Sequence, residues 1–390
     1  MLVPHSNTCL LSWLTVVSIL LGGLWLSLLA NHAQAVIIAM VVLVPIGIFS
    51  LSLTSLIASF QNSSLPEYTY LSTISLIGLA SSLASAFVIW TRRDLIKLWT
   101  SIAQLACNIL EVNSFLFVLS ALFMVGHIVF TAGWLWLFSI VYFHSSSDAE
   151  ILVPCFFILM YFWTSSIFQN LEKVVVSSVV GEWYFLRFEE TATSDRTFHH
   201  LNHVVRTSFG SVAIASFVLG TIRTLKFVLY LLQKKSRSRS LGFVGSCLGF
   251  IASLVERFSS YTLVYVGLTG DSFSSSSYSC SRLFRRNLVL GLITSNLNQI
   301  VSLLGRILVA GSVGIIVFWV RVANPHTNDL PGYEWLAALI SSVVPYYVMC
   351  VLTHVVDSTT DATFVCYLVD LDTNSCHSEG AHAIFSESLK

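Results

Sequence analysis

The first 91 residues carry a single acidic or basic side chain, Glu67, and no other feature of the sequence constrains the fold as strongly. A helix crosses the hydrocarbon core of a bilayer with about 20 apolar residues, because each residue adds about 1.5 Å. Polar breaks at 31–34 and 61–67 divide this stretch into three apolar segments, each long enough to cross. The segments lie at about 10–30, 36–60 and 68–91.

Six further apolar runs follow, and only 10% of the 390 residues are charged, against about a quarter in soluble domains. Together the runs predict an all-α, polytopic transmembrane bundle of about nine spans, forming one domain over 1–390. The six runs lie at about 115–141, 151–180, 208–232, 241–268, 288–320 and 335–356.

Three segments between and after the runs have a different character. The stretch 94–112 is amphipathic, which is typical of a helix that lies in the membrane interface. The polar segment 187–206 predicts a cytosolic loop, and 371–390 predicts a cytosolic C-terminal tail.

The basic residues of the segment Arg92–Lys97 indicate the orientation, because Lys and Arg concentrate on the cytosolic side of membrane proteins. With this segment in the cytosol, the 61–67 loop lies outside. That loop contains the sequon Asn62-Ser63-Ser64, so Asn62 is a candidate glycosylation site.

A second basic run, Lys234–Arg239, conflicts with this orientation. If the runs 208–232 and 241–268 both cross the membrane, these basic residues lie outside. Re-entrant or in-plane helices would remove the conflict, and the sequence leaves both alternatives open.

The motifs of soluble enzymes are absent, so the sequence predicts no enzyme, no catalytic residue and no cofactor. The formal net charge is zero, and nothing indicates binding to nucleic acid. His199, His200 and His203 are spaced so that one metal ion is conceivable, but no neighbouring carboxylate or cysteine cluster completes a site. We therefore expect these histidines to belong to a solvated segment, and no metal site.

Ionisable residues within apolar runs are more informative, because a charge in lipid is costly and usually faces a cavity or a partner. Each has an ordinary alternative, as an interfacial residue, a residue that extends to the surface, or a helix cap. These residues are Glu172, Lys173, Glu182, Arg223, Lys226, Glu256, Arg257, Asp357 and Asp361.

Aromatic residues near the irregular segments would suit one type of ligand. A quaternary ammonium is held by aromatic faces, each worth about 0.5–2 kcal/mol. Tryptophan and tyrosine are also common at the two membrane interfaces, which is the alternative for each of them. The candidates are Trp163, Trp183, Tyr184, Tyr261 and Tyr265.

Three segments carry a resemblance to a known family. The first, Asn170–Phe185, is similar to the pattern N-x-x-H-V-x-x-A-G-x-x-x-x-W-Y-F, with Lys173 at the position of the His and Ser178 at that of the Gly. In the second, Ser208–Ser211 matches S-F-G-S, and Tyr265–Phe273 resembles Y-V-G-I-Y-G-x-S-F. The third, 357–370, resembles D-S-x-x-x-T-x-x-V-C-F-x-E-D, with Val369 at the position of the Glu.

These patterns resemble the choline transporter-like family over about 90–370. The resemblance implies about ten spans, both termini in the cytosol and a place in the plasma membrane. The first span counted above falls near the family's second, so the chain would lack the family's first helix.

The resemblance further implies transport of choline or a related quaternary or primary amine, such as ethanolamine, by alternating access within the lipid bilayer. Cation–π contacts would come from Trp183, Tyr184 and Tyr265, and polar contacts from Asn170 and Glu172. The alternative is a scaffold or trafficking protein that keeps the family fold but transports nothing.

Overall fold

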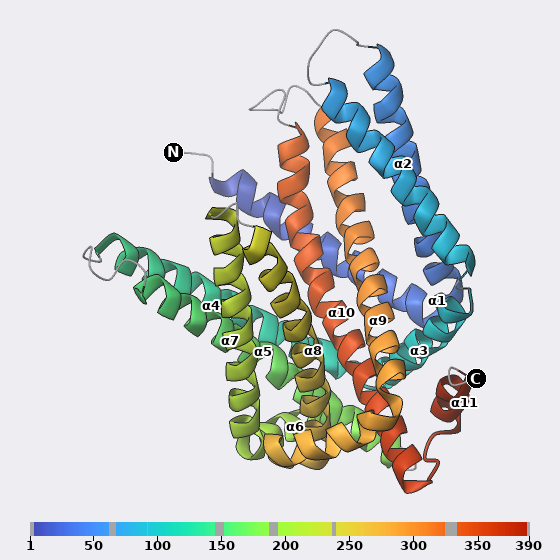
Figure 1. The fold of residues 1–390 in the computed structure, drawn as a ribbon, viewed down its shortest axis with the longest axis vertical. Coiled ribbons are helices and arrows are strands. Elements are labelled where there is room, and N and C mark those ends of the chain that lie inside the picture. Colours follow the sequence, from blue (N-terminus) through green and yellow to red (C-terminus); the bar gives the residue numbers. More distant parts are fainter. Residues whose placement is uncertain are drawn as a thin grey trace. The chain divides into compact units, whose positions relative to one another are not determined.

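The computed structural model describes residues 4–61, 68–91, 93–144, 152–186, 194–235, 239–323 and 334–387. Every regular element in these ranges is a helix, and they contain no strand, which confirms the all-α fold (Figure 1). The helices are α1 (Pro4–Gln61), α2 (Tyr68–Thr91), α3 (Arg93–Val112), α4 (Phe115–His144), α5 (Leu152–Phe185), α6 (Ser194–Thr207), α7 (Phe209–Lys235), α8 (Arg239–Thr269), α9 (Phe273–Ala323), α10 (Glu334–Thr373) and α11 (Glu379–Glu387).

Long apolar helices with outward-facing hydrophobic side chains indicate lipid as the surrounding solvent. Val129 is 67% exposed and Trp136 is 69% exposed on α4, for example, which would be unfavourable in water. Within the described ranges, four segments are long and apolar enough to cross a membrane, and three shorter apolar segments accompany them; the count of nine stays a prediction. The four are Phe115–Val141, Phe209–Leu231, Gln299–Val320 and Trp335–Thr373, and the shorter three are Val16–Leu29, Pro45–Ile57 and Ser75–Ala84.

The first two predicted spans, 10–30 and 36–60, are two helical segments joined across a kink within α1. The predicted break at 31–34 is a kink, where His32 leaves helical geometry with φ of −134° and ψ of 39°. The Asn31 side-chain amide donates to the Ser27 carbonyl oxygen at 3.0 Å, so a polar residue is satisfied within the helix at the kink.

Two segments predicted to be irregular contain helices. Much of 187–206 forms α6, because Leu201 and Val204 place an apolar stripe against the neighbouring helices in a segment that is polar overall. The tail 371–390 contains the end of α10 and all of α11. Their cytosolic location stays a prediction, as does the interfacial location of the amphipathic helix α3.

Several orientation cues lie outside the described residues. These are Asn62 with its sequon, Arg92, and the centre of the basic run at 236–238. The runs 208–232 and 241–268 each form one helix, α7 and α8, and their membrane crossing stays open.

The sequence predicts one domain over 1–390, and the structure divides the chain into two compact units. Unit 1 comprises 1–108, 293–353 and 384–390, and unit 2 comprises 109–292 and 354–383. Four helices, α3, α9, α10 and α11, therefore contribute to both units. The core of unit 1 is apolar and consists of Trp25, Leu29, Ile37, Ala103, Cys107, Val301, Val309 and Met349.

Unit 2 is organised around α5, which packs against α4, α6, α7 and α8. Glycines permit two of these contacts, because a Cβ on Gly220 of α7 would lie 2.8 Å from the Trp163 backbone. A Cβ on Gly267 of α8 would lie 2.6 Å from the Val174 carbonyl oxygen. The helix backbones thus approach more closely than any larger residue would permit.

Charged residues predicted to interrupt α7 and α8 pair with each other. Lys226 lies 3.1 Å and Arg223 lies 3.8 Å from the carboxylate oxygens of Glu256. About a third of each side chain in this group is exposed. A charge in one helix thus finds its partner in the next, which reduces the cost of placing both in apolar segments.

Substitution of Gly267 by alanine tests the close approach of α8 to α5. The new methyl group would force the backbones apart, and overpacking of this kind costs about 1–3 kcal/mol. We expect Gly267→Ala to lower the melting temperature of the detergent-purified protein. The matched control is Gly249→Ala in the same helix, where an added Cβ meets nothing within 4 Å. Equal melting temperatures for the two variants would contradict the close approach.

Candidate functional site

A group of charged side chains lies buried between the helices of unit 2, and we call it the charge cluster. It consists of Glu172 and Lys173 on α5 with His354 and Asp361 on α10. His354 and Asp361 are seven residues apart, two helical turns, so both face the same side of α10. Asp357 lies between these two residues on the same face of α10, three residues after His354 and four before Asp361.

The side chain of Glu172 contacts a hydroxyl and an imidazole. Its carboxylate accepts a hydrogen bond from the Ser120 hydroxyl of α4, and one oxygen lies 3.4 Å from the Nδ1 atom of His354. The residue is only 8% exposed. The carboxylate is thus buried beside a hydroxyl and an imidazole.

Lys173 pairs with a carboxylate. Its ammonium lies 2.6 Å from an oxygen of Asp361 and also donates to the Ser260 hydroxyl of α8. Each side chain of the pair is 12% exposed. The cluster therefore contains two carboxylates and one lysine, and it connects α4, α5, α8 and α10.

Asn170 lies on another side of α5. Residues two apart on a helix do not face each other, and Asn170 donates to the Ser216 hydroxyl of α7 at 2.8 Å. The structure therefore buries both Asn170 and Glu172, as expected for polar contacts, but directs them toward different helices.

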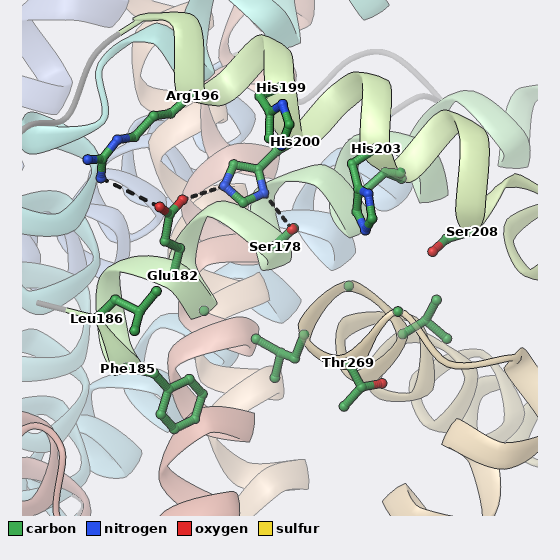
Figure 2. Close-up of a pocket in the computed structure, with 16 residues that line it drawn as sticks. Ser178, Glu182, Phe185, Leu186, Arg196, His199, His200, His203, Ser208 and Thr269 are labelled. Atoms are coloured by element: carbon green, nitrogen blue, oxygen red, sulfur yellow. Dashed lines mark hydrogen bonds and ion pairs between the residues drawn. The ribbon is translucent and has the colours of Figure 1, made fainter. Parts of the chain in front are cut away.

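A pocket of about 870 Å³ lies at the end of α5, beside α6 and the end of α8 (Figure 2). Glu182 is at its wall, between two cationic or titratable side chains of α6. One carboxylate oxygen contacts His200 Nε2, and the other lies 3.5 Å from Arg196. The second ring nitrogen of His200 lies 2.8 Å from the Ser178 hydroxyl, so this network fastens α6 to α5.

His199 and His203 also line this pocket. Within the described ranges, no three His, Cys, Asp or Glu side chains are placed to hold a metal ion. The contacts of His200 to Glu182 and Ser178 instead give this part of α6 a structural link to α5.

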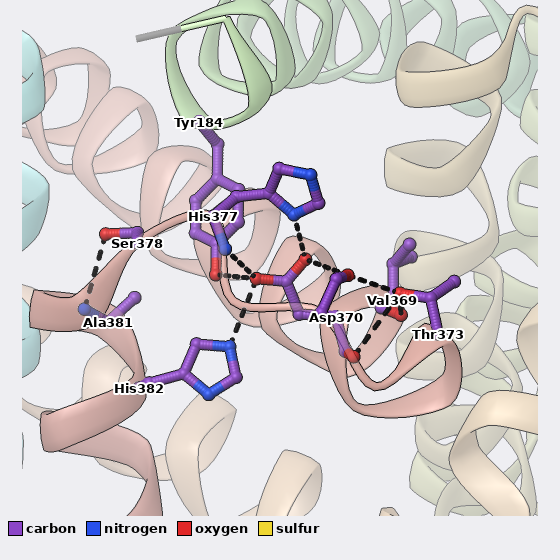
Figure 3. A network of polar contacts seen from close by, with 9 residues as sticks. Tyr184, Val369, Asp370, Thr373, His377, Ser378, Ala381 and His382 are labelled. Atoms are coloured by element: carbon purple, nitrogen blue, oxygen red, sulfur yellow. Dashed lines mark hydrogen bonds and ion pairs between the residues drawn. The ribbon is translucent and has the colours of Figure 1, made fainter.

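A second network surrounds Asp370 near the end of α10 (Figure 3). Asp370 is fully buried and accepts a hydrogen bond from the Tyr184 hydroxyl at 3.0 Å. The backbone N–H of His377 donates to the same carboxylate at 3.0 Å. Ring nitrogens of His377 and His382 lie 2.6 and 3.1 Å from its oxygens. This network fastens the segment after α10 to the end of α5.

None of the three aromatic residues predicted to hold a cation lines the pocket at the end of α5. Tyr184 is fully buried, and its hydroxyl is engaged by Asp370. Trp183 and Tyr265 are partly exposed, and neither is among the side chains that line the pocket. Tyr265 directly precedes Val266, which does line it.

The sequence did not single out two of the residues that surround Glu172. Ser120 lies in a plain apolar run and gives no signal in the sequence, and His354 lies within the last predicted span. Asp361 was a candidate for an interior pathway or a helix cap, and its 2.6 Å contact to Lys173 places it inside the bundle. A search for titratable residues within predicted spans would have found His354.

Residues 76–372 match the family described as plasma-membrane choline transporters. The chain belongs to this family. The resemblance seen in the three sequence segments is thereby confirmed.

Relatives of this choline transporter-like chain share modest identity with it. A CTL-like protein of Dictyostelium discoideum is 30% identical over 288 residues, which cover 66% of this chain and 52% of that protein. Choline transporter-like protein 2 of Cavia porcellus is 25% identical over 244 residues, which cover 59% of this chain and 34% of that protein. The chain thus matches about half or less of the length of these curated relatives.

Replacement of Tyr184 by phenylalanine tests whether this residue supports the C-terminal segment. The change removes one donor from the buried Asp370, and such a bond to a charged group is worth about 1.5–3 kcal/mol. We expect faster hydrogen exchange in residues 374–383. Tyr278→Phe is the control, because that side chain is 76% exposed. Unchanged exchange in the Tyr184 variant would argue against this supporting role.

Proposed function

We propose that this protein carries choline or a related quaternary or primary amine across a membrane, with the charge cluster as the place where the amine's charge is balanced. The proposal rests on family membership and on one observation, the buried carboxylate of Glu172. Family membership supports a choline-like substrate in general terms, and the particular amine belongs to the proposal.

The energetic argument concerns the cost of a carboxylate in an apolar bundle. A buried ion loses several kcal/mol of hydration, so it is retained where a partner or a function offsets the loss. Glu172 and Asp361 carry two formal negative charges, and Lys173 carries one positive charge. These three residues leave one net negative charge, to which Asp357 on the same face of α10 adds, and a monovalent organic cation would offset this charge.

The other residues predicted to contact the amine have different roles in this proposal. Asn170 lies two residues from Glu172 and would serve a hydroxyl group on the side toward α7. Trp183 and Tyr265 remain proposed cation–π contacts, to be tested by substitution. Tyr184 is better explained by its hydrogen bond to Asp370.

Uptake of radiolabelled choline by cells that express the protein tests the proposal. We expect saturable uptake, and a reduction of about tenfold or more in Glu172→Gln, because a neutral amide cannot balance the charge of the amine. Glu256→Gln is the matched control, since Glu256 is also ion-paired but lies on α8 outside the cluster. Surface expression must be equal for all variants.

The outcomes separate transport from other roles. Retained uptake in Glu172→Gln would remove the charge cluster from the proposal, and loss in Trp183→Ala would then favour the predicted aromatic site. Absence of uptake by a correctly inserted protein, with choline and with ethanolamine, would favour a non-transporting scaffold or trafficking protein.

A further inference from the structure

The ammonium group of Lys173 is itself an organic cation fixed inside the charge cluster. It lies 2.6 Å from Asp361, it is held by the Ser260 hydroxyl, and the pair is 12% exposed on each side. A transported amine would bring the same charge to the same group of carboxylates. Lys173 and the substrate therefore both present one positive charge to the cluster.

The carboxylates of Asp361 and Glu172 have different kinds of partner. Asp361 is occupied by a charged partner, whereas Glu172 contacts the Ser120 hydroxyl and the His354 ring. Lys173 directly follows Glu172 on α5. An amine that approaches Glu172 thus enters close to a fixed positive charge, and in a poorly hydrated interior like charges repel strongly.

We propose that Lys173 is a tethered competitor of the transported amine: it occupies Asp361 when no substrate is present and must be displaced for the amine to bind at full strength. This inference rests on the proposed function. Displacement is feasible because the ammonium sits on a flexible stem of four carbons with rotatable bonds. Competition of this kind weakens binding of the amine and favours its release, and it makes Lys173 a determinant of affinity.

Binding to the purified full-length chain tests the inference more directly than transport does. Lys173→Met removes the charge and keeps an unbranched apolar stem, so Asp361 becomes available to an external cation. At mildly alkaline pH, we expect the dissociation constant of choline and of tetramethylammonium to fall by about tenfold or more relative to the wild type. Lys173→Arg keeps the charge and should bind as weakly as the wild type.

The controls exploit a second lysine–carboxylate pair in the same unit. Lys226 pairs with Glu256 at 3.1 Å, with about a third of each side chain exposed, and lies outside the cluster. Lys226→Met should leave the dissociation constant unchanged. Asp361→Asn in the Lys173→Met background should abolish the gain, because the carboxylate that became available is then missing.

A gain in affinity discriminates between competition and a structural role, because damage to the fold would weaken binding. If Lys173→Met binds either cation no more tightly than the wild type, the inference is overturned. If that variant does not fold, Lys173→Gln replaces it, since the amide can still donate to Asp361 and Ser260. Equal or weaker binding by this variant would likewise overturn the inference.

Choline uptake by cells that express the protein separates this inference from the proposed function. Choline uptake by the wild type without tighter binding in the neutral variants would refute the competitor and leave transport intact. Tighter binding in the neutral variants without uptake by the wild type would support the competitor and refute transport.

Discussion

The structure of unit 2 depends on the burial of two adjacent ionisable residues on one helix. Glu172 and Lys173 are carried into the interior by α5, whose surrounding positions are mostly valine and other apolar residues. Neither charge can be left without a partner at acceptable cost. The partners come from three other helices: Ser120 on α4, Ser260 on α8, and His354 with Asp361 on α10. The requirement to satisfy these charges thus helps to set which helices surround α5.

The apolar contacts of α5 are compatible with this arrangement because small residues allow close packing. Gly220 and Gly267 bring α7 and α8 against the backbone of α5, where neighbouring hydroxyl groups can then be reached. The end of α5 also holds neighbouring segments in place, beside the pocket. Glu182 holds α6 through His200, and Tyr184 reaches the carboxylate that fastens the segment after α10. The charge cluster, the pocket and the C-terminal network are thus all built on one helix.

The charge cluster offers a physical link between the family of this chain and its proposed site. Under the proposed function, a choline-like cation in an apolar interior would be stabilised by negative charge or by aromatic faces, and this chain places the carboxylates of Glu172 and Asp361 there. It also supplies its own cation beside them. Carboxylates that are partly neutralised from within would bind a substrate less tightly than fully available ones, and weak binding favours release on the far side of a membrane.

The sequence by itself determined that the protein is helical and lies in a membrane, because apolar runs near 20 residues have no other solvent that suits them. It also determined the family, since three short patterns occurred in the right order. It indicated the kink near His32 from a cluster of polar residues, and the two predicted spans lie on either side of that kink in α1. It missed α6, because the apolar stripe of Leu201 and Val204 is hidden in a segment that is polar on average.

Only the tertiary structure decided which ionisable residues meet. Lys173 and Asp361 are separated by 188 positions in the sequence, and nothing local to either residue indicates a contact of 2.6 Å. Likewise, Tyr184 matched a family motif, but its fully buried hydroxyl bonded to Asp370 shows a supporting role that the motif does not reveal. Hydropathy and motifs are local properties of the chain. The partners of a buried charge depend on helix packing, which brings together residues from distant segments.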